Sequence, residues 1–214
     1  MPKDEYIGYV YDAPVHYIVL NSFEPTFTLE RVEKYLSILD KIEASSGPGV
    51  MVTVGSGKRH FSTGFDLPYW IEDFSNFKNS MLRMNEVWAR LLSFPMPTIA
   101  VFNGNAIAGG YLLGMCHDYR LMNAKVGTIC LSELKFGMAL IEPYMHITMA
   151  KLAPMVATKI VMGITYRQEE ALKDALIDDT YSDAEQLQHK LAAFVRRYAG
   201  LGAKRMALQV NKQN

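Results

Sequence analysis

The chain has 214 residues, of which 50% are hydrophobic and 21% are charged, a composition typical of a globular protein rather than a disordered one. Lysine and arginine together number 22, as do aspartate and glutamate, so no positive excess favours a nucleic acid as the main partner. The segment up to Pro14 holds no apolar core of a secretory signal, and the closing NKQN holds no tripeptide peroxisomal address, so no targeting signal is visible.

Strands and helices alternate over the first half of the chain. Apolar periodicity and β-rich runs predict, in chain order, a strand at 15–20, a helix at 28–44, a strand at 50–54, a helix at 77–93 and a strand at 98–102. A short apolar helix then follows the paired Gly109 and Gly110. This order predicts βα units with parallel pairing, and the continuously apolar strands favour a sheet covered on both faces.

The second part of the chain has a different character. Helical patterns cover 143–152, 154–162, 167–176 and 183–198. Ser182 and Glu185 predict a capping box at the start of the last helix. The apolar stripe along that helix indicates ordinary packing, with a subunit contact as the alternative. We therefore expect an α/β core over 1–142 and an all-helical region over 143–214.

The uncharged stretch 91–116 is long enough to cross a membrane. Pro95 and Pro97 interrupt it, and Asn103-Gly104 is typical of a turn, so the stretch predicts a buried strand, a turn and a buried helix, without membrane insertion. Both cysteines of the chain lie in apolar sequence, which favours reduced core residues over a disulfide or a metal site.

Motifs for several common chemistries are incomplete. The segment 55–60, GSGKRH, lacks the P-loop pattern, because Val52 and Arg59 stand where a glycine and a serine or threonine are needed. Lys58 and Arg59 in this turn are then either solvated or in contact with a phosphate. The five histidines show no metal-ligand spacing and no GxSxG motif is present, so we expect neither a metal site nor a serine hydrolase.

Three short stretches remain as candidate chemistry. FSTGFDL (61–67) and AIAGGYLL (106–113) each follow a strand, and their glycines can expose backbone N–H groups that a side chain would block. Two such groups converging on one point would form an oxyanion hole, although two tight turns are the alternative. Glu133, in LSELKFG (131–137), lies between apolar residues, where desolvation would make it a better base; a surface glutamate is the alternative.

At these three places the chain resembles the crotonase family, the enoyl-CoA hydratase/isomerase superfamily. The matching segments are GSGKRHFSTGFDLPYW, PMPTIAVFNGNAIAGGYLLGMCHDYRLM and LSELKFGMAL, and the similarity extends over nearly the whole chain from about residue 15. The resemblance implies an α/β fold with a ββα spiral core and a helical C-terminal region used in trimerisation. It also implies an acyl-CoA thioester as substrate, with no separate cofactor, and a homotrimer or a dimer of trimers.

The family's motifs assign roles to individual residues. The N–H groups of Phe65 and Gly109 would hold the thioester oxygen, and Glu133 would be the catalytic base. The backbone around 61–63 would lie near the adenine end of coenzyme A. The remaining candidate substrate contacts are Phe61, Ser62, Thr63, Asp66, Leu67, Leu112 and Lys58.

The reaction depends on the acids. Hydratases of the family resemble one another in carrying a second glutamate three residues after the glycine-rich turn, and here that position is Leu112. A leucine cannot orient the attacking water, so the chain is most similar to the Δ3-Δ2-enoyl-CoA isomerases, in particular the peroxisomal ones. Glu133 would carry a proton from C2 to C4 of a 3-enoyl-CoA in fatty-acid β-oxidation, with Glu142 as a weaker second candidate, and Leu112 would belong to an apolar wall.

Other interpretations stay open. A different crotonase reaction on an acyl-CoA thioester, such as hydrolysis, decarboxylation or weak hydration, is one alternative, and a non-catalytic acyl-CoA-binding subunit is another. The chain ends at Asn214, before the final helix of many family members, so the affinity for coenzyme A and the stability of the trimer are open questions. The location would be the peroxisome, the mitochondrion or the cytoplasm.

Overall fold

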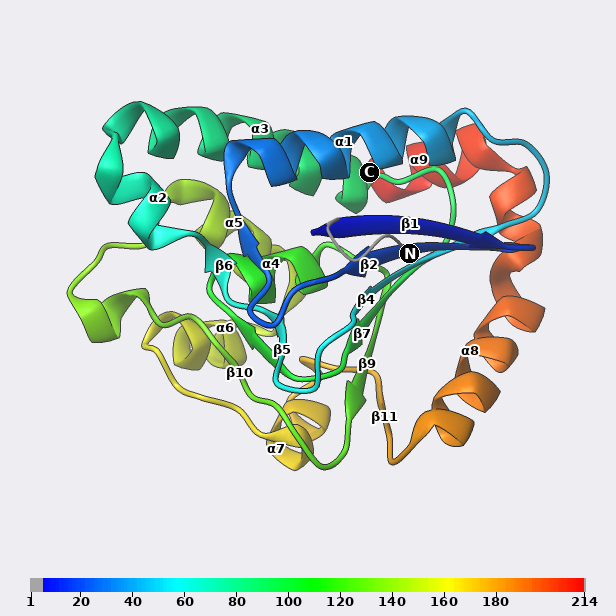
Figure 1. Cartoon of the computed structure of the whole chain (residues 1–214). Helices are drawn as coiled ribbons and strands as arrows, with labels where there is room; N and C mark the ends of the chain where they lie inside the picture. The colour runs from blue at the N-terminus through cyan, green and yellow to red at the C-terminus, as the bar shows by residue number, and fades with distance from the viewer. Residues whose placement is uncertain (1–5, 214) are drawn as a thin grey trace.

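The computed structural model describes residues 6–213, and its main feature is a six-stranded sheet (Figure 1). Its strands lie in the order β1 (Ile7–Asp12), β2 (Val15–Leu20), β4 (Val50–Gly55), β7 (Thr98–Phe102), β9 (Tyr119–Asn123) and β11 (Asp179–Tyr181). β1 and β2 pair antiparallel, and the other neighbours pair parallel. Residues 1–5 and 214, which hold part of both termini inspected for targeting signals, lie outside the described residues.

Two smaller parallel sheets lie beside the large one. The three-stranded sheet contains β10 (Ile129–Cys130), β8 (Asn105–Ile107) and β5 (His60–Ser62), and the two-stranded sheet contains β3 (Thr26–Phe27) and β6 (Gly64–Phe65). Strands of the large and the three-stranded sheet alternate along the chain, as β4 and β5, β7 and β8, then β9 and β10, and helical segments follow each pair. This arrangement confirms the ββα spiral expected from the sequence.

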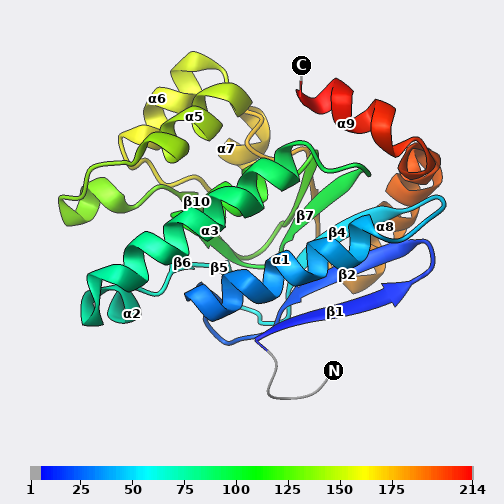
Figure 2. The same cartoon turned by 90° about the horizontal axis from the view of Figure 1, so that it is seen from above.

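Helices cover the strands on both sides. The α-helices are α1 (Leu29–Glu43), α2 (Leu67–Glu72), α3 (Phe74–Leu92), α4 (Gly109–Met115), α5 (Glu142–Lys151), α6 (Pro154–Val161), α7 (Gln168–Lys173), α8 (Ala184–Tyr198) and α9 (Arg205–Gln213), and the 3₁₀ turns are η1 (Glu133–Phe136) and η2 (Ala199–Ala203). α1 and α3 lie side by side over one face of the large sheet, and α8 lies on the other side (Figure 2).

The central strands of the large sheet are buried on both faces, as their apolar sequences predict, whereas residues 10–12 of the edge strand β1 are exposed. Met51 and Phe102 point into the main core beneath α1 and α3, whereas Val52 and Val101 point into a second cluster beneath α8. This alternation follows from the two-residue period of a strand. The apolar stripe of α8 belongs to the second cluster through Leu187, Leu191, Phe194, Val195 and Tyr198, which confirms packing as its role.

The prediction of an all-helical region after residue 142 is wrong. β11 pairs parallel with β9, in a register that places Asp179 opposite Leu121. The Arg120 guanidinium lies 2.7 Å from the Asp178 carboxylate and anchors this register. A strand of three residues is too short to show a period in the sequence. The boundary between 1–142 and 143–214 as separate units stays a prediction.

Two details of the C-terminal helices also differ from expectation. The cap of α8 is Asp183, whose carboxylate accepts from the backbone N–H of Gln186, so the predicted pair Ser182 and Glu185 lies one residue out of place. α9 is a helix that the sequence pattern did not reveal. Lys212 attaches it to the sheet by donating to the carbonyl of Met96 and to Asp118, at 3.0 and 2.6 Å.

The buried strand and the buried helix predicted within the uncharged stretch 91–116 are β7 and α4, but the short strand β8 between them was not predicted. Within residues 6–213, no helix has the length and apolar character needed to span a membrane. Cys116 and Cys130 are both buried and unpaired, as expected of core residues.

Candidate active site

A cavity of about 270 Å³ lies where α2 and α3 face η1 and the start of α5. Its lining residues are Thr63, Phe65, Leu67, Trp70, Phe77, Met81, Ala108, Ser132, Glu133, Phe136, Met138, Ala139, Ile141 and Tyr144. Most of these side chains are apolar, and among the described residues Glu133 is the one carboxylate in the lining. A mostly apolar cavity with a few polar groups is typical of a small-molecule site.

Glu133 is the first residue of η1, which begins directly after Ser132 and shortly after the end of β10. The residue is 9% exposed, and its Oε2 is buried without a hydrogen-bond partner in the described structure. Burial raises the pKa of the carboxyl, and hydrogen bonds to the backbone of Glu133 and Ser132 offset part of this effect. A desolvated carboxylate that lines a mostly apolar cavity and has one oxygen without a partner is suited to accept a proton.

Two backbone N–H groups, of Phe65 and Gly109, are the candidates for an oxyanion site. The N–H of Asp66 donates to the carbonyl of Phe27 at 3.2 Å, which ties β6 to β3. Because successive N–H groups of a strand point to opposite sides, the N–H of Phe65 points away from β3. Gly109 is the first residue of α4, so its N–H has no acceptor within the helix.

Glycines let these two backbone segments approach each other. A Cβ on Gly64, whose φ is +88°, would lie 2.7 Å from the nitrogen of Gly109. A Cβ on Gly110 would lie 2.2 Å from the carbonyl oxygen of Ser62, a distance that no real contact allows. Gly110 is therefore required because α4 rests directly on the backbone at the end of β5, whereas a Cβ on Gly109 would make only a tight contact, 3.3 Å from the Cα of Gly64.

Ala108, the residue before α4, has a φ of +52° and a ψ of −123°, a conformation that a residue with a side chain rarely adopts. Its N–H donates to the carbonyl of Cys130 at 3.0 Å, which fixes it between α4 and β10. Such strain costs of order 1–3 kcal/mol and gathers at functional sites. This conformation could not be predicted from the sequence, because alanine is not a residue that marks a left-handed turn.

The structure brings four of the residues predicted from the sequence into the cavity wall: Thr63, Phe65, Leu67 and Glu133. Gly109 is not itself among the lining residues, but it follows Ala108, which is, and a Cβ on Gly109 would lie 3.3 Å from both Gly64 and the ring of Phe65. These residues come from β6, α2, α4 and η1, which the spiral places together although they are spread over some seventy positions of the sequence.

Other predicted substrate contacts have structural partners instead. Phe61 is fully buried, with its ring edge-on to Phe102 at 4.9 Å between centroids. Ser62 donates to the carbonyl of Pro25 at 2.9 Å and accepts from the N–H of Gly64 at 3.1 Å. Both side chains are therefore occupied within the protein. The expectation that the backbone around 61–63 contacts the substrate stays a prediction.

Asp66 is also occupied, since its carboxylate caps α2 through the N–H of Tyr69 and accepts from the hydroxyl of Thr26 at 2.9 Å. Lys58 is exposed in the turn between β4 and β5 and lies outside the cavity lining. Glu142, in the first turn of α5, has an 81% exposed side chain close to His146, so it faces solvent and not the cavity.

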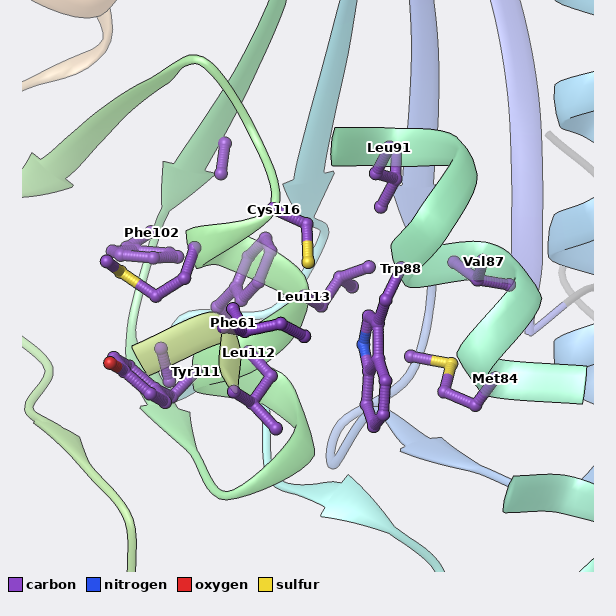
Figure 3. Packing of buried hydrophobic residues seen from close by; sticks show 14 of the residues in the cluster. Phe61, Met84, Val87, Trp88, Leu91, Phe102, Tyr111, Leu112, Leu113 and Cys116 are labelled. Atoms are coloured by element: carbon purple, nitrogen blue, oxygen red, sulfur yellow. The ribbon is translucent and has the colours of Figure 1, made fainter. Parts of the chain in front are cut away.

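Leu112 lies in the second turn of α4 and is fully buried. Figure 3 shows it packed in the core together with Phe61, Trp88 and Met84. The prediction that Leu112 forms part of the cavity wall is therefore wrong, because its side chain belongs to the packing behind the wall. The position of the second hydratase glutamate is nevertheless a leucine here, so it supplies no carboxylate.

Three aromatic residues that line the cavity were not predicted from the sequence. Tyr144 is 4% exposed, lines the cavity and packs edge-on to Trp88 at 5.6 Å. Burial, with a smaller contribution from the charge of Glu133, keeps the pKa of this tyrosine above its ordinary range. Trp70 and Phe77 also line the cavity. Helical spacing in a sequence cannot distinguish a residue that lines a cavity from one that packs in the core.

Comparisons with known proteins agree with this geometry. Residues 12–212 match the family model described as enoyl-CoA hydratase/isomerase. Enoyl-CoA delta isomerase 2, peroxisomal, of Arabidopsis thaliana is 30% identical over 197 residues, which cover 87% of this chain and 80% of the relative. Enoyl-CoA delta isomerase 3 of the same organism is 31% identical over 173 residues, which cover 76% of this chain and 71% of the relative.

Among solved structures, a probable enoyl-CoA hydratase from Mycobacterium tuberculosis H37Rv superposes with a TM-score of 0.88. The match covers 98% of this chain and 89% of that one at 22% identity, so it bears on the fold alone. The match to the family model spans nearly the entire chain and includes every element that forms the cavity. The chain therefore belongs to the enoyl-CoA hydratase/isomerase family and has the crotonase fold.

Proposed function

We propose that this chain is an enoyl-CoA isomerase that moves the double bond of a 3-enoyl-CoA into conjugation, giving the trans-2-enoyl-CoA. The observation that carries the proposal is Glu133, a buried carboxylate with one unpartnered oxygen in an otherwise apolar cavity. The isomerase names of the two Arabidopsis relatives support it.

In the proposed mechanism, Glu133 removes a proton from C2 of the acyl chain, and negative charge spreads through the dienolate to the thioester oxygen. The N–H groups of Phe65 and Gly109 donate to that oxygen. Removing one such donor from an enzyme typically costs ~10²–10³ in rate. Glu133 then returns the same proton at C4, so one carboxylate is sufficient and no other reactant is consumed.

The apolar wall supports this single-base route. Apolar side chains such as Leu67, Phe136 and Met138 make up most of the cavity lining, whose polar residues besides Glu133 include Thr63 and Ser132. Exclusion of water protects the dienolate and strengthens the electrostatic stabilisation within the site. Hydration in the family uses two glutamates, and the second position is Leu112 here, buried in the core.

Incubation with trans-3-hexenoyl-CoA tests the proposal. Isomerisation produces a conjugated thioester that absorbs in the ultraviolet and leaves the mass of the molecule unchanged. We expect turnover by the wild type and its loss in Glu133→Gln, with Glu142→Gln as the matched control that keeps full activity. A product heavier by one water would indicate hydration, release of free coenzyme A would indicate hydrolysis, and binding without turnover would indicate a non-catalytic subunit.

Several finer expectations belong to the same proposal. The substrate is an acyl-CoA thioester, and the chain acts in fatty-acid β-oxidation as a homotrimer or a dimer of trimers. Its location is the peroxisome or the mitochondrion, as in the names of relatives from Arabidopsis and mouse. Size-exclusion chromatography with light scattering tests the assembly state.

A further inference from the structure

Four aromatic side chains form a continuous row from the candidate oxyanion site to the surface, defined here as Phe65, Trp70, Phe77 and Phe74. The ring centroids of Phe65 and Trp70 are 4.2 Å apart, and the next step, to Phe77, is 4.5 Å. Phe74 then stacks on Phe77 at 5.5 Å. The row begins at β6, crosses α2 and ends at the first residue of α3.

Exposure to solvent increases along this aromatic row. Phe65 is 7% exposed, Trp70 and Phe77 are half-buried, and Phe74 is 76% exposed. The first three residues line the cavity, and Phe74 extends the same apolar surface beyond it. Burying such a ring is favourable by up to about 1.5–3 kcal/mol, so an aromatic side chain left in water next to a cavity marks a binding surface.

Other apolar residues that line the cavity are also exposed to solvent. Phe136 and Met138 line the cavity, yet they are 72% and 39% exposed. Leu67, at the start of α2, also lines the cavity and is 43% exposed. On this side the cavity is therefore open to solvent, and its apolar lining continues onto the protein surface.

The chemistry of the surface indicates its occupant. Among the described residues that line the cavity, none is a lysine or arginine, so this side is unsuited to the phosphates of coenzyme A. The row begins at Phe65, whose N–H we place at the thioester oxygen. The other substituent of that carbonyl is the acyl chain, an apolar group of the right chemistry.

We infer that this site takes long-chain acyl-CoA substrates, and that the aromatic row carries the acyl tail out of the cavity to Phe74. This inference rests on the proposed function, because it takes the thioester carbonyl to lie at Phe65. It makes Phe74 a specificity-determining residue that contacts only chains long enough to leave the cavity. Chain length then has no sharp upper limit, since the end of the row is open.

The size of the effect follows from the burial of methylene groups. Full burial of one methylene raises the affinity up to roughly fourfold, and partial burial along the half-exposed aromatic row would raise it about twofold for each methylene. We expect kcat/KM to rise with acyl length from six to fourteen carbons. Phe74→Ala should lower kcat/KM about three- to tenfold for the longer substrate and less than twofold for the shorter one.

The experiment compares trans-3-hexenoyl-CoA with trans-3-tetradecenoyl-CoA on four proteins: wild type, Phe74→Ala, Phe74→Leu and Met206→Ala. Phe74→Leu keeps an apolar side chain and should restore much of the long-chain activity. Met206 is the matched control, because its side chain is 81% exposed on α9, away from the row. Calorimetric binding of saturated hexanoyl-CoA and dodecanoyl-CoA, which cannot isomerise, reports on the row without catalysis.

The outcomes separate the inference from the proposed function. Turnover of both substrates without a gain for the longer one, or an equal effect of Phe74→Ala on both, overturns the row and leaves the isomerase in place. Tighter binding of dodecanoyl-CoA that depends on Phe74, without isomerase turnover, supports the row and overturns the isomerase. A change of assembly state in Phe74→Ala with an unchanged length profile shows that a second copy of the chain covers this surface, which also overturns the inference.

Discussion

Replacing Gly110 by alanine tests whether the close contact between α4 and β5 positions the candidate oxyanion site. A Cβ at this position would lie 2.2 Å from the carbonyl oxygen and 2.6 Å from the carbonyl carbon of Ser62. Both atoms belong to the backbone, so a side-chain rotation cannot relieve the clash. The end of β5 would have to move, and it leads within three residues to Phe65.

The cost can be worked from these contacts. Overpacking of this kind destabilises by about 1–3 kcal/mol, and a strained hydrogen bond of Ser62 adds about 1 kcal/mol. The better helix propensity of alanine returns about 1 kcal/mol. The net loss of about 1–3 kcal/mol corresponds to a fall in Tm of roughly 2–12 °C for a chain of this size. A displacement of about 1 Å at Phe65 would lower kcat about 10²-fold.

Thermal unfolding and the isomerase assay measure the two effects on Gly110→Ala. Gly200→Ala is the matched control, because a Cβ on Gly200 meets no atom within 4 Å. We expect the control to match the wild type in both measurements. A Gly110→Ala protein with wild-type Tm and wild-type turnover would refute the claim that this contact positions the site.

Three further variants test the burial of single side chains. Burial raises the pKa of Glu133, so the contribution of this residue to stability falls as the pH rises above about 4.3, the ordinary pKa of a glutamate. Glu133→Gln should therefore have a higher Tm than the wild type at pH 8 and a smaller advantage at pH 4. A pH-independent difference in Tm would contradict this. Leu112→Ala should lower the free energy of unfolding by roughly 2–5 kcal/mol in urea titrations, and a loss below 1 kcal/mol would be inconsistent with its full burial. Lys212→Met should lower the free energy of unfolding by about 1–3 kcal/mol, because it removes the donors to Met96 and Asp118. Lys204 is exposed, so Lys204→Met serves as the control and should leave stability unchanged. Equal Tm values for the two variants would contradict the docking of α9 through Lys212.

Much of the fold could be predicted because its longer elements carry a clear period. α1, α8 and β7 agree with their predicted ranges to within one residue, since each has an apolar pattern at least five residues long. β10 and β11 were invisible, because two or three residues cannot show a period. Their pairing depends on partners far away in the chain, and no local pattern reports such a contact.

The candidate site was predictable to the extent that backbone conformation defines it. Gly64 and Gly109 mark close backbone approaches, and glycine is visible in a sequence. Polar residues beside them were misleading, since Ser62 and Asp66 serve local hydrogen bonds and a helix cap. Tyr144 reaches the cavity only through the packing of α5, which the sequence does not reveal.

The central claim, that Glu133 alone carries the proton, is tested most directly by the isomerase reaction in deuterated water. A single carboxylate that moves one proton from C2 to C4 before it exchanges with solvent predicts a conjugated product of unchanged mass that retains most of its hydrogen at C4. Glu133→Gln should lose this reaction by at least ~10³-fold, of the order found when a proton-transfer group is removed. Wild-type turnover in Glu133→Gln, or a product containing added water, would contradict the single-glutamate mechanism.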